Sequence, residues 1–145
     1  MTIVGHEKLT ARDIMTPECQ CVRSSDSVLD AARKLVELEV GALPICGEDN
    51  KLKGMLTDRD IVVKVVAQRK DPIGLKAGDL AEGVPVVAQA DDDVDQVVRL
   101  MAEHQIRRIP VLDRTELVGI IAQADIARAL ENRASGEVVE AISQE

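Results

Sequence analysis

Aromatic residues are absent from this chain, which has 145 residues but no Phe, Tyr or Trp. Proteins that bind single-stranded nucleic acid usually stack the bases on aromatic side chains, so the composition disfavours that class. The formal net charge of -8 at pH 7 points the same way, because binding a phosphate backbone needs clustered Lys and Arg. We therefore expect no nucleic-acid partner, and a hydrophobic core built from Val, Leu, Ile, Ala and Met.

Export signals and long apolar runs are missing as well. The N-terminal segment Met1–Glu7 has neither the basic nor the apolar stretch of a signal peptide. No apolar run approaches the roughly 18 residues that a membrane span needs. The three cysteines are an odd number and do not resemble the disulfide framework of a secreted domain. These absences predict a cytoplasmic protein with no membrane partner.

What the sequence does contain is an internal repeat. Pro44 and Pro110 lie 66 positions apart, and the strings around them, GALPI and RRIPV, align at that offset. After the prolines the offset becomes 65, which places GMLTDRDIV over GIIAQADIA. The chain is therefore a duplication. Two apolar sets with the spacing i, i+3, i+4, i+7 also match and predict one buried helix face per copy: Val28, Ala31, Ala32, Leu35 and Val94, Val97, Val98, Met101.

Each copy predicts the same order of elements, β-α-β-β-α. A lead-in helix begins at Thr10, with Asp13 at capping-box spacing, and a polar break caps each amphipathic helix (24–26 and 91–93). The fold class is thus α/β (α+β), with short helical pieces at both ends. The expected strands are 19–23, 42–46 and 51–56 in the first copy and 85–88, 108–112 and 116–121 in the second, with final helices from Asp58 and Gln123. The expected domains are 8–70 and 75–133, followed by a helical tail at 134–145.

Two copies that carry x-x-P-(V/I) and then G-h-h-(T/S)-x-x-D, where h is apolar and the second copy has Ala122 at the (T/S) position, resemble the CBS domain family. The resemblance covers roughly Thr10 to Asn132 and rests on the four strings above, in order and in register. It implies a stand-alone regulatory pair, packed sheet against sheet about a pseudo-twofold axis and often assembled as a homodimer. It also implies two clefts between the copies, where adenine nucleotides (AMP, ADP or ATP) bind in many members. A role in stress response would rest on the same resemblance.

Thr57 and Asp60 are the first candidate site residues. Thr57 lies where a strand leads into a helix, so its hydroxyl and the N–H groups of the helix start could hold a phosphate. If the family's assignment carries over, Asp60 accepts hydrogen bonds from a ribose diol. The same pair also has the spacing of a capping box, in which the helix satisfies its own first N–H groups. Both interpretations stay open at this point.

The second copy keeps the aspartate, as Asp125, but has Ala122 in place of the threonine. A carboxylate here still suits the positive end of the helix dipole, while the hydroxyl that would hold a phosphate is missing. By the same resemblance Asp125 is the second ribose-binding residue. We expect one competent site and one weak or altered site.

An anionic ligand of an acidic protein needs a local positive patch. Arg59 adjoins Asp60, while Arg107 and Arg108 lead into the second proline-containing strand. A guanidinium forms a forked pair of hydrogen bonds with a phosphate, so these three arginines are the candidate phosphate ligands. The alternative for Arg107 and Arg108 is that they are solvated strand-end charges or pair with nearby acidic residues.

Without aromatics, an adenine ring would have to lie between aliphatic side chains. The candidates flank the two prolines and the first β segment of each copy, and the alternative is that they are simply core. The prolines themselves are expected at a strand edge or a strand start, where no ladder N–H is needed. The candidates are Val22, Leu43, Pro44, Val86, Ile109 and Pro110.

The cysteines suggest a different type of module. Cys19 and Cys21 lie in the first β segment and Cys46 ends the neighbouring strand, so a Cys21–Cys46 disulfide or a thiol switch is one hypothesis. The alternative is buried thiols in a reducing cytosol. Together with His104 the cysteines are numerous enough for zinc, but their spacing matches no zinc finger. We predict no metal site.

Enzyme motifs are also missing: the sequence has no Walker A loop, no H-E-x-x-H and no G-x-S-x-G. We therefore predict a non-catalytic sensor that requires no cofactor, has an adenine nucleotide as its possible ligand, forms a homodimer and acts on an unknown protein partner. The alternative is a nucleotide-independent dimeric interaction or redox module that uses the cysteines.

Overall fold

The computed structural model describes residues 9–17, 20–81, 83 and 85–132. Cys19 and the expected tail at 134–145 lie outside the described residues. The described residues form two compact units. We call them the first-repeat unit, which comprises the described part of 19–86 with 114–117, and the second-repeat unit, which comprises the described part of 1–18, 87–113 and 118–145.

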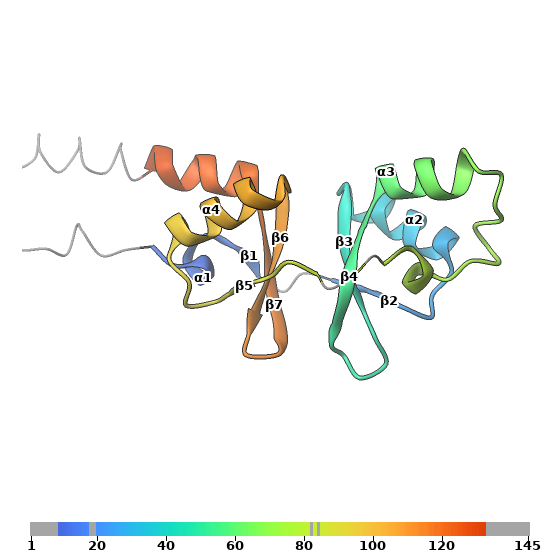
Figure 1. The fold of residues 1–145 in the computed structure, drawn as a ribbon, viewed down its shortest axis with the longest axis horizontal. Helices are drawn as coiled ribbons and strands as arrows, with labels where there is room; N and C mark the ends of the chain where they lie inside the picture. Colours follow the sequence, from blue (N-terminus) through green and yellow to red (C-terminus); the bar gives the residue numbers. More distant parts are fainter. Residues whose placement is uncertain (1–8, 18–19, 82, 84, 133–145) are drawn as a thin grey trace, which may run out of the picture. The chain divides into compact units, whose positions relative to one another are not determined.

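The first-repeat unit contains a three-stranded sheet in the order β2-β3-β4. Its central strand β3 pairs in parallel with β2 and antiparallel with β4. Helices α2 and α3 lie on the same side of this sheet (Figure 1). The elements are β2 (Val22–Arg23), α2 (Val28–Leu38), β3 (Ala42–Cys46), β4 (Leu52–Thr57), α3 (Asp58–Ile61), a π-helical stretch (Val62–Val66) and a 3-10 helix (Ala77–Leu80).

The second-repeat unit contains a four-stranded sheet in the order β1-β7-β6-β5. Strand β5 pairs in parallel with β6, and β1 pairs antiparallel with β7. Residues 123–132 form the last described helix. The predicted α/β class, with β-α-β-β-α repeated twice, is confirmed. The other elements are α1 (Ala11–Ile14), β1 (Thr16–Pro17), β5 (Ala88–Gln89), α4 (Val94–His104), β6 (Arg108–Asp113) and β7 (Glu116–Ala122).

Each lead-in segment packs on the repeat that does not follow it in the sequence. The Ala11 N–H donates to the Asp92 carbonyl at 2.8 Å, and β1 aligns Thr16 with Ile120, so α1 and β1 belong to the second-repeat unit. The Ala77 N–H donates to the Asp26 carbonyl at 2.7 Å, which attaches the 3-10 helix to the first-repeat unit. The domain boundaries at 8–70 and 75–133 stay a prediction about the repeat in the sequence.

The two amphipathic helices begin and end alike. Ser27 accepts from the Asp30 N–H to cap α2, one residue after the predicted break, and Asp93 caps α4. Three of the four predicted positions on each helix are buried. The exception in α4 is Val98, which is 39% exposed, so its predicted burial is wrong. It lines a groove of about 520 Å³ beside helix 123–132.

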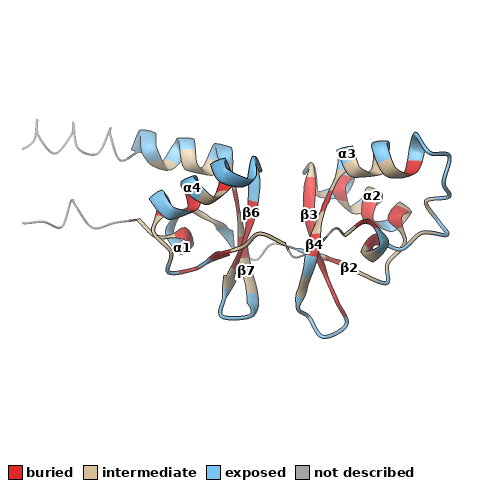
Figure 2. Ribbon diagram, in the orientation of Figure 1, coloured by how far each residue is buried: buried red, intermediate tan, exposed pale blue. Residues whose placement is uncertain are grey.

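Both prolines lie inside the central strands and are fully buried. The prediction of an edge or a strand start is therefore wrong. Pairing with the short parallel strand begins one residue later in each case, at Ile45 and Val111, so the missing proline N–H leaves no gap in that ladder. Figure 2 shows β3 buried along its whole length.

Candidate ligand pocket

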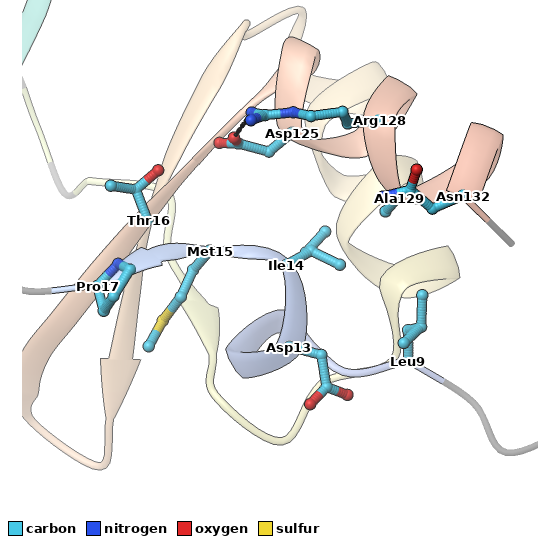
Figure 3. Close-up of a pocket in the computed structure, with 10 residues that line it drawn as sticks. All are labelled: Leu9, Asp13, Ile14, Met15, Thr16, Pro17, Asp125, Arg128, Ala129 and Asn132. Carbon is cyan, nitrogen blue, oxygen red and sulfur yellow. Dashed lines mark hydrogen bonds and ion pairs between the residues drawn. The ribbon is translucent and has the colours of Figure 1, made fainter.

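A pocket of about 580 Å³ lies between the lead-in segment and helix 123–132, entirely within the second-repeat unit. Figure 3 shows Asp125 and Arg128 on the helix side, with Ile14 and Thr16 facing them from the lead-in side. The residues that line it are Leu9, Asp13, Ile14, Met15, Thr16, Pro17, Asp125, Arg128, Ala129 and Asn132.

Asp125 occupies the first turn of helix 123–132 because β7 ends directly before it. One carboxylate oxygen, Oδ2, accepts from the backbone N–H of Ala122 at 2.8 Å, and Oδ1 accepts from Arg128 at 2.5 Å. Its side chain is only 11% exposed. The backbone bond therefore fixes the orientation of a carboxylate in the wall of the pocket, as half of a capping box that has no hydroxyl partner.

Gly119 lets the lead-in strand approach β7. A Cβ at this position would lie 2.5 Å from Met15 Sδ and 2.8 Å from the carbonyl oxygen of Thr16, distances that no side chain can tolerate without displacing the strand. Because Met15 and Thr16 line the pocket, this glycine determines how close the lead-in wall lies to the sheet.

Thr57 and Asp60 form the complete capping box that the sequence allowed. The Asp60 N–H donates to Thr57 Oγ1, and the Thr57 N–H donates to Asp60 Oδ2, both at 3.0 Å. Lys64 Nζ lies 3.4 Å from Asp60 Oδ1. Thr57 and Asp60 therefore cap the helix in this structure. The ligand role of Asp60 stays a prediction. The lead-in positions that match the Asp125 pocket are near 80–85, of which 82 and 84 lie outside the described residues.

The three candidate arginines are all exposed. The guanidinium groups of Arg59, Arg107 and Arg108 form no hydrogen bond or ion pair in the part of the chain that the structure describes, although the backbone N–H of Arg59 donates to Asp58 Oδ1 at 2.7 Å. Arg107 lines the groove beside α4 rather than the Asp125 pocket. The suggestion that they pair with nearby acidic residues finds no support, while their role toward a phosphate remains a prediction.

The adenine candidates lie mostly in the core. Val22 and Leu43 belong to the buried cluster of the first-repeat unit, and Ile109 is fully buried in β6. Val86 alone among the six is partly exposed. Their burial agrees with the alternative interpretation that they are core residues. None of the six lines the Asp125 pocket.

No disulfide joins Cys21 and Cys46. Arg23 rather than Cys21 is aligned with Cys46 in the parallel β2–β3 register, so the two thiols are two positions apart along the ladder. Among the described residues no group of three or more His, Cys, Asp or Glu side chains is placed to hold a metal ion. The thiol switch stays a hypothesis with no structural feature in its favour.

Comparison with known families decides what kind of module this is. The family model described as CBS domain matches the chain twice, at residues 11–67 and 77–132. The chain belongs to the CBS domain family. Hypoxic response protein 1 of Mycobacterium tuberculosis is 45% identical over 92% of this chain and 93% of its own length. None of the helices that the structure describes is long and apolar enough to cross a membrane.

Three solved structures of CBS proteins resemble this chain. Hypoxic Response Protein I, crystallised with two coordinated zinc ions, has a TM-score of 0.78 and 46% identity, covering 83% of this chain and 98% of its own. CBSX2 in complex with AMP has a TM-score of 0.73 and 30% identity, over 85% and 96% of the two chains. The CBS pair of MJ0100, with 5′-methylthioadenosine and S-adenosylmethionine, has a TM-score of 0.76 and 29% identity, over 87% and 98%.

Sequence reasoning found Asp125 but missed the residues around it. Thr16 and Pro17 stand about one hundred positions before Asp125, and no local pattern links the two segments. The repeat did mark the lead-in segment as a structural element, because the segment that ends at Ile14 aligns with the one that ends at Leu80. Arg128 could have been found as a basic residue one turn after Asp125 on the same helix face.

Proposed function

We propose that this CBS pair is a non-catalytic regulatory module that binds an adenine nucleotide, with its ribose on Asp125. One observation carries the proposal: a carboxylate fixed by a backbone bond forms part of the wall of a pocket large enough for a drug-sized ligand. The solved relatives support the class of ligand. AMP, 5′-methylthioadenosine and S-adenosylmethionine, bound by CBSX2 and by MJ0100, share an adenosine moiety.

The pocket offers each part of adenosine a partner. The vicinal hydroxyls of a ribose are two adjacent donors, which suit the carboxylate of Asp125. The apolar side chain of Ile14, on the helix side of the lead-in segment in Figure 3, offers a surface for the purine, which the chain must bind without aromatics. The hydroxyl of Thr16, drawn on the Asp125 side in Figure 3, supplies a donor and an acceptor.

The first repeat provides the second proposed ribose ligand, Asp60, with Thr57 beside it for a phosphate. Both already bond to each other's backbone, but each carboxylate oxygen and hydroxyl has a further lone pair to accept from a ligand. A ligand that binds two arrangements of the protein unequally shifts their populations. We propose this as the regulatory signal, read by a homodimer or a protein partner.

The ultraviolet spectrum of the purified protein shows whether purine is already bound, because a chain without Trp and Tyr absorbs little itself. Affinity is then measured by calorimetry. AMP is titrated by calorimetry into the wild type, Asp125→Asn, Asp60→Asn and Glu37→Gln. The asparagine keeps an oxygen for the Ala122 N–H but loses the charge. We expect Asp125→Asn to weaken AMP binding about tenfold or more, the scale of a lost charged hydrogen bond.

Glu37→Gln is the matched control, because it removes one carboxylate from the exposed face of α2. Its affinity for AMP should equal that of the wild type. Wild-type affinity in both aspartate variants, or no binding of AMP to the wild type at all, would contradict the proposal. A loss in Asp60→Asn alone would move the competent site to the first repeat.

A further inference from the structure

Arg128 is the one cationic side chain among the described residues that line the Asp125 pocket. Its Nη2 donates to Asp125 Oδ1 at 2.5 Å, three residues earlier on the same helix. The two partners differ sharply in exposure, since the side chain of Arg128 is 67% exposed and that of Asp125 only 11%. The arginine is therefore the partner that can leave the ion pair for water or for a ligand.

The other residues that line the pocket carry no positive charge that would attract a phosphate. Asp13 is the other carboxylate, and it already accepts from the N–H of Thr10 at 2.8 Å and from its hydroxyl at 3.1 Å. Figure 3 shows the carboxylate of Asp13 directed away from Asp125 and Arg128. An anionic group entering this pocket thus depends on Arg128 for its attraction, against two negative charges.

We propose that Arg128 makes the pocket selective for phosphorylated adenosine ligands by exchanging one anion for another. It pairs with Asp125 in the empty pocket and with the ligand's phosphate once the ribose hydroxyls occupy Asp125. This inference rests on the proposed function, because it requires ribose on Asp125. A nucleoside without a phosphate displaces Arg128 and leaves it only water, whereas AMP gives the guanidinium a forked anionic partner. A sulfonium ligand such as S-adenosylmethionine brings a positive charge next to Arg128 and is disfavoured.

The first repeat lacks this arrangement. Val63 stands at the position that matches Arg128, and the residue that forms an ion pair with Asp60 is Lys64, four residues on rather than three. An ammonium is a compact point charge without the planar fork of a guanidinium. The selectivity is therefore a property of the second-repeat unit.

The test compares adenosine ligands with and without a phosphate. AMP, adenosine and 5′-methylthioadenosine are titrated by calorimetry into the full-length wild type, Arg128→Gln, Arg128→Lys and the control Arg33→Gln, at one ionic strength. Arg33 is exposed on α2 in the first-repeat unit, so its loss changes the net charge equally. Circular dichroism confirms that each variant is folded.

We expect Arg128→Gln to weaken AMP binding about 10- to 100-fold while adenosine and methylthioadenosine change less than about threefold. Arg128→Lys should keep part of the preference for AMP, and Arg33→Gln all of it. An equal loss for AMP and adenosine in Arg128→Gln would overturn the selectivity while leaving the proposed function intact. Absence of binding by the wild type to all three ligands would overturn both together.

Discussion

The two repeats differ at the same structural point, the turn from the second long strand into the last helix. In the first, Thr57 and Asp60 form both halves of a capping box. In the second, Ala122 has no hydroxyl, yet Asp125 still accepts from the Ala122 N–H at 2.8 Å. The comparison teaches that the carboxylate alone is sufficient to form the turn. The hydroxyl is an addition of the first repeat, and the aspartate of the second repeat forms its ion pair with an arginine rather than a lysine.

The largest expected effect comes from truncating matched residues of the two central strands. Leu43 and Ile109 occupy equivalent positions and are both buried. Leu43→Ala and Ile109→Ala should each lower the free energy of unfolding by about 2–5 kcal/mol, because each deletes buried methyl groups and leaves a cavity. Urea unfolding followed by circular dichroism at 222 nm measures the loss. If either variant were as stable as the wild type but bound AMP poorly, that side chain would be a ligand contact rather than core.

The second comparison uses the two glycines that begin the repeated G-h-h motif. Gly119→Ala would place a Cβ 2.8 Å from the carbonyl oxygen of Thr16, whereas Gly54→Ala would place one 3.0 Å from the side chain of Ala81. We expect Gly119→Ala to cost about 1–3 kcal/mol of stability, as overpacking does, and Gly54→Ala less. AMP binding should weaken in Gly119→Ala because Met15 and Thr16 line the pocket. Equal effects of the two substitutions on stability would show that the two lead-ins pack equally tightly.

The smallest expected effect comes from exchanging the capping residues themselves. Thr57→Ala should cost about 0.5–2 kcal/mol, because it removes the acceptor of the Asp60 N–H. Ala122→Thr supplies the missing acceptor and should raise the urea midpoint slightly. A neutral result for Thr57→Ala would mean that the carboxylate half of the box already satisfies the turn in both repeats.

Local patterns predicted most of the fold. Strand β3 has the predicted bounds, β6 and β7 each end one residue later than predicted, and β4 begins and ends one residue later. These elements follow from apolar periodicity and from turn and capping residues, which act within a few positions of one another. The duplication supplies a second, independent pattern for each element, because both copies have the same order.

The packing between segments that lie far apart in the sequence was not predicted. The attachment of α1 and β1 to the second-repeat unit depends on contacts such as Thr16 with Ile120. The periodicity of apolar residues within one segment does not predict such contacts. The burial of Pro44 and Pro110 was missed because the parallel partner strand is only two residues long and starts just after each proline. Val98 was assigned to the core by spacing alone, although the groove beside α4 leaves it exposed. Of the candidate site residues that the structure describes, Asp125 alone lines the pocket between the lead-in segment and helix 123–132.

The pairing of Thr16 with Ile120 also determines the order in which the protein can be built during synthesis. Nearly all of the first-repeat unit is one continuous stretch of chain, so it can form as soon as that stretch has left the ribosome. The strand at Thr16–Pro17 emerges earlier still but waits for β7, close to the other end of the described chain. Contacts of such long sequence separation form slowly. Among the described residues, the Asp125 pocket thus needs both the lead-in segment and helix 123–132, so it can form only after the chain has been synthesised through Asn132.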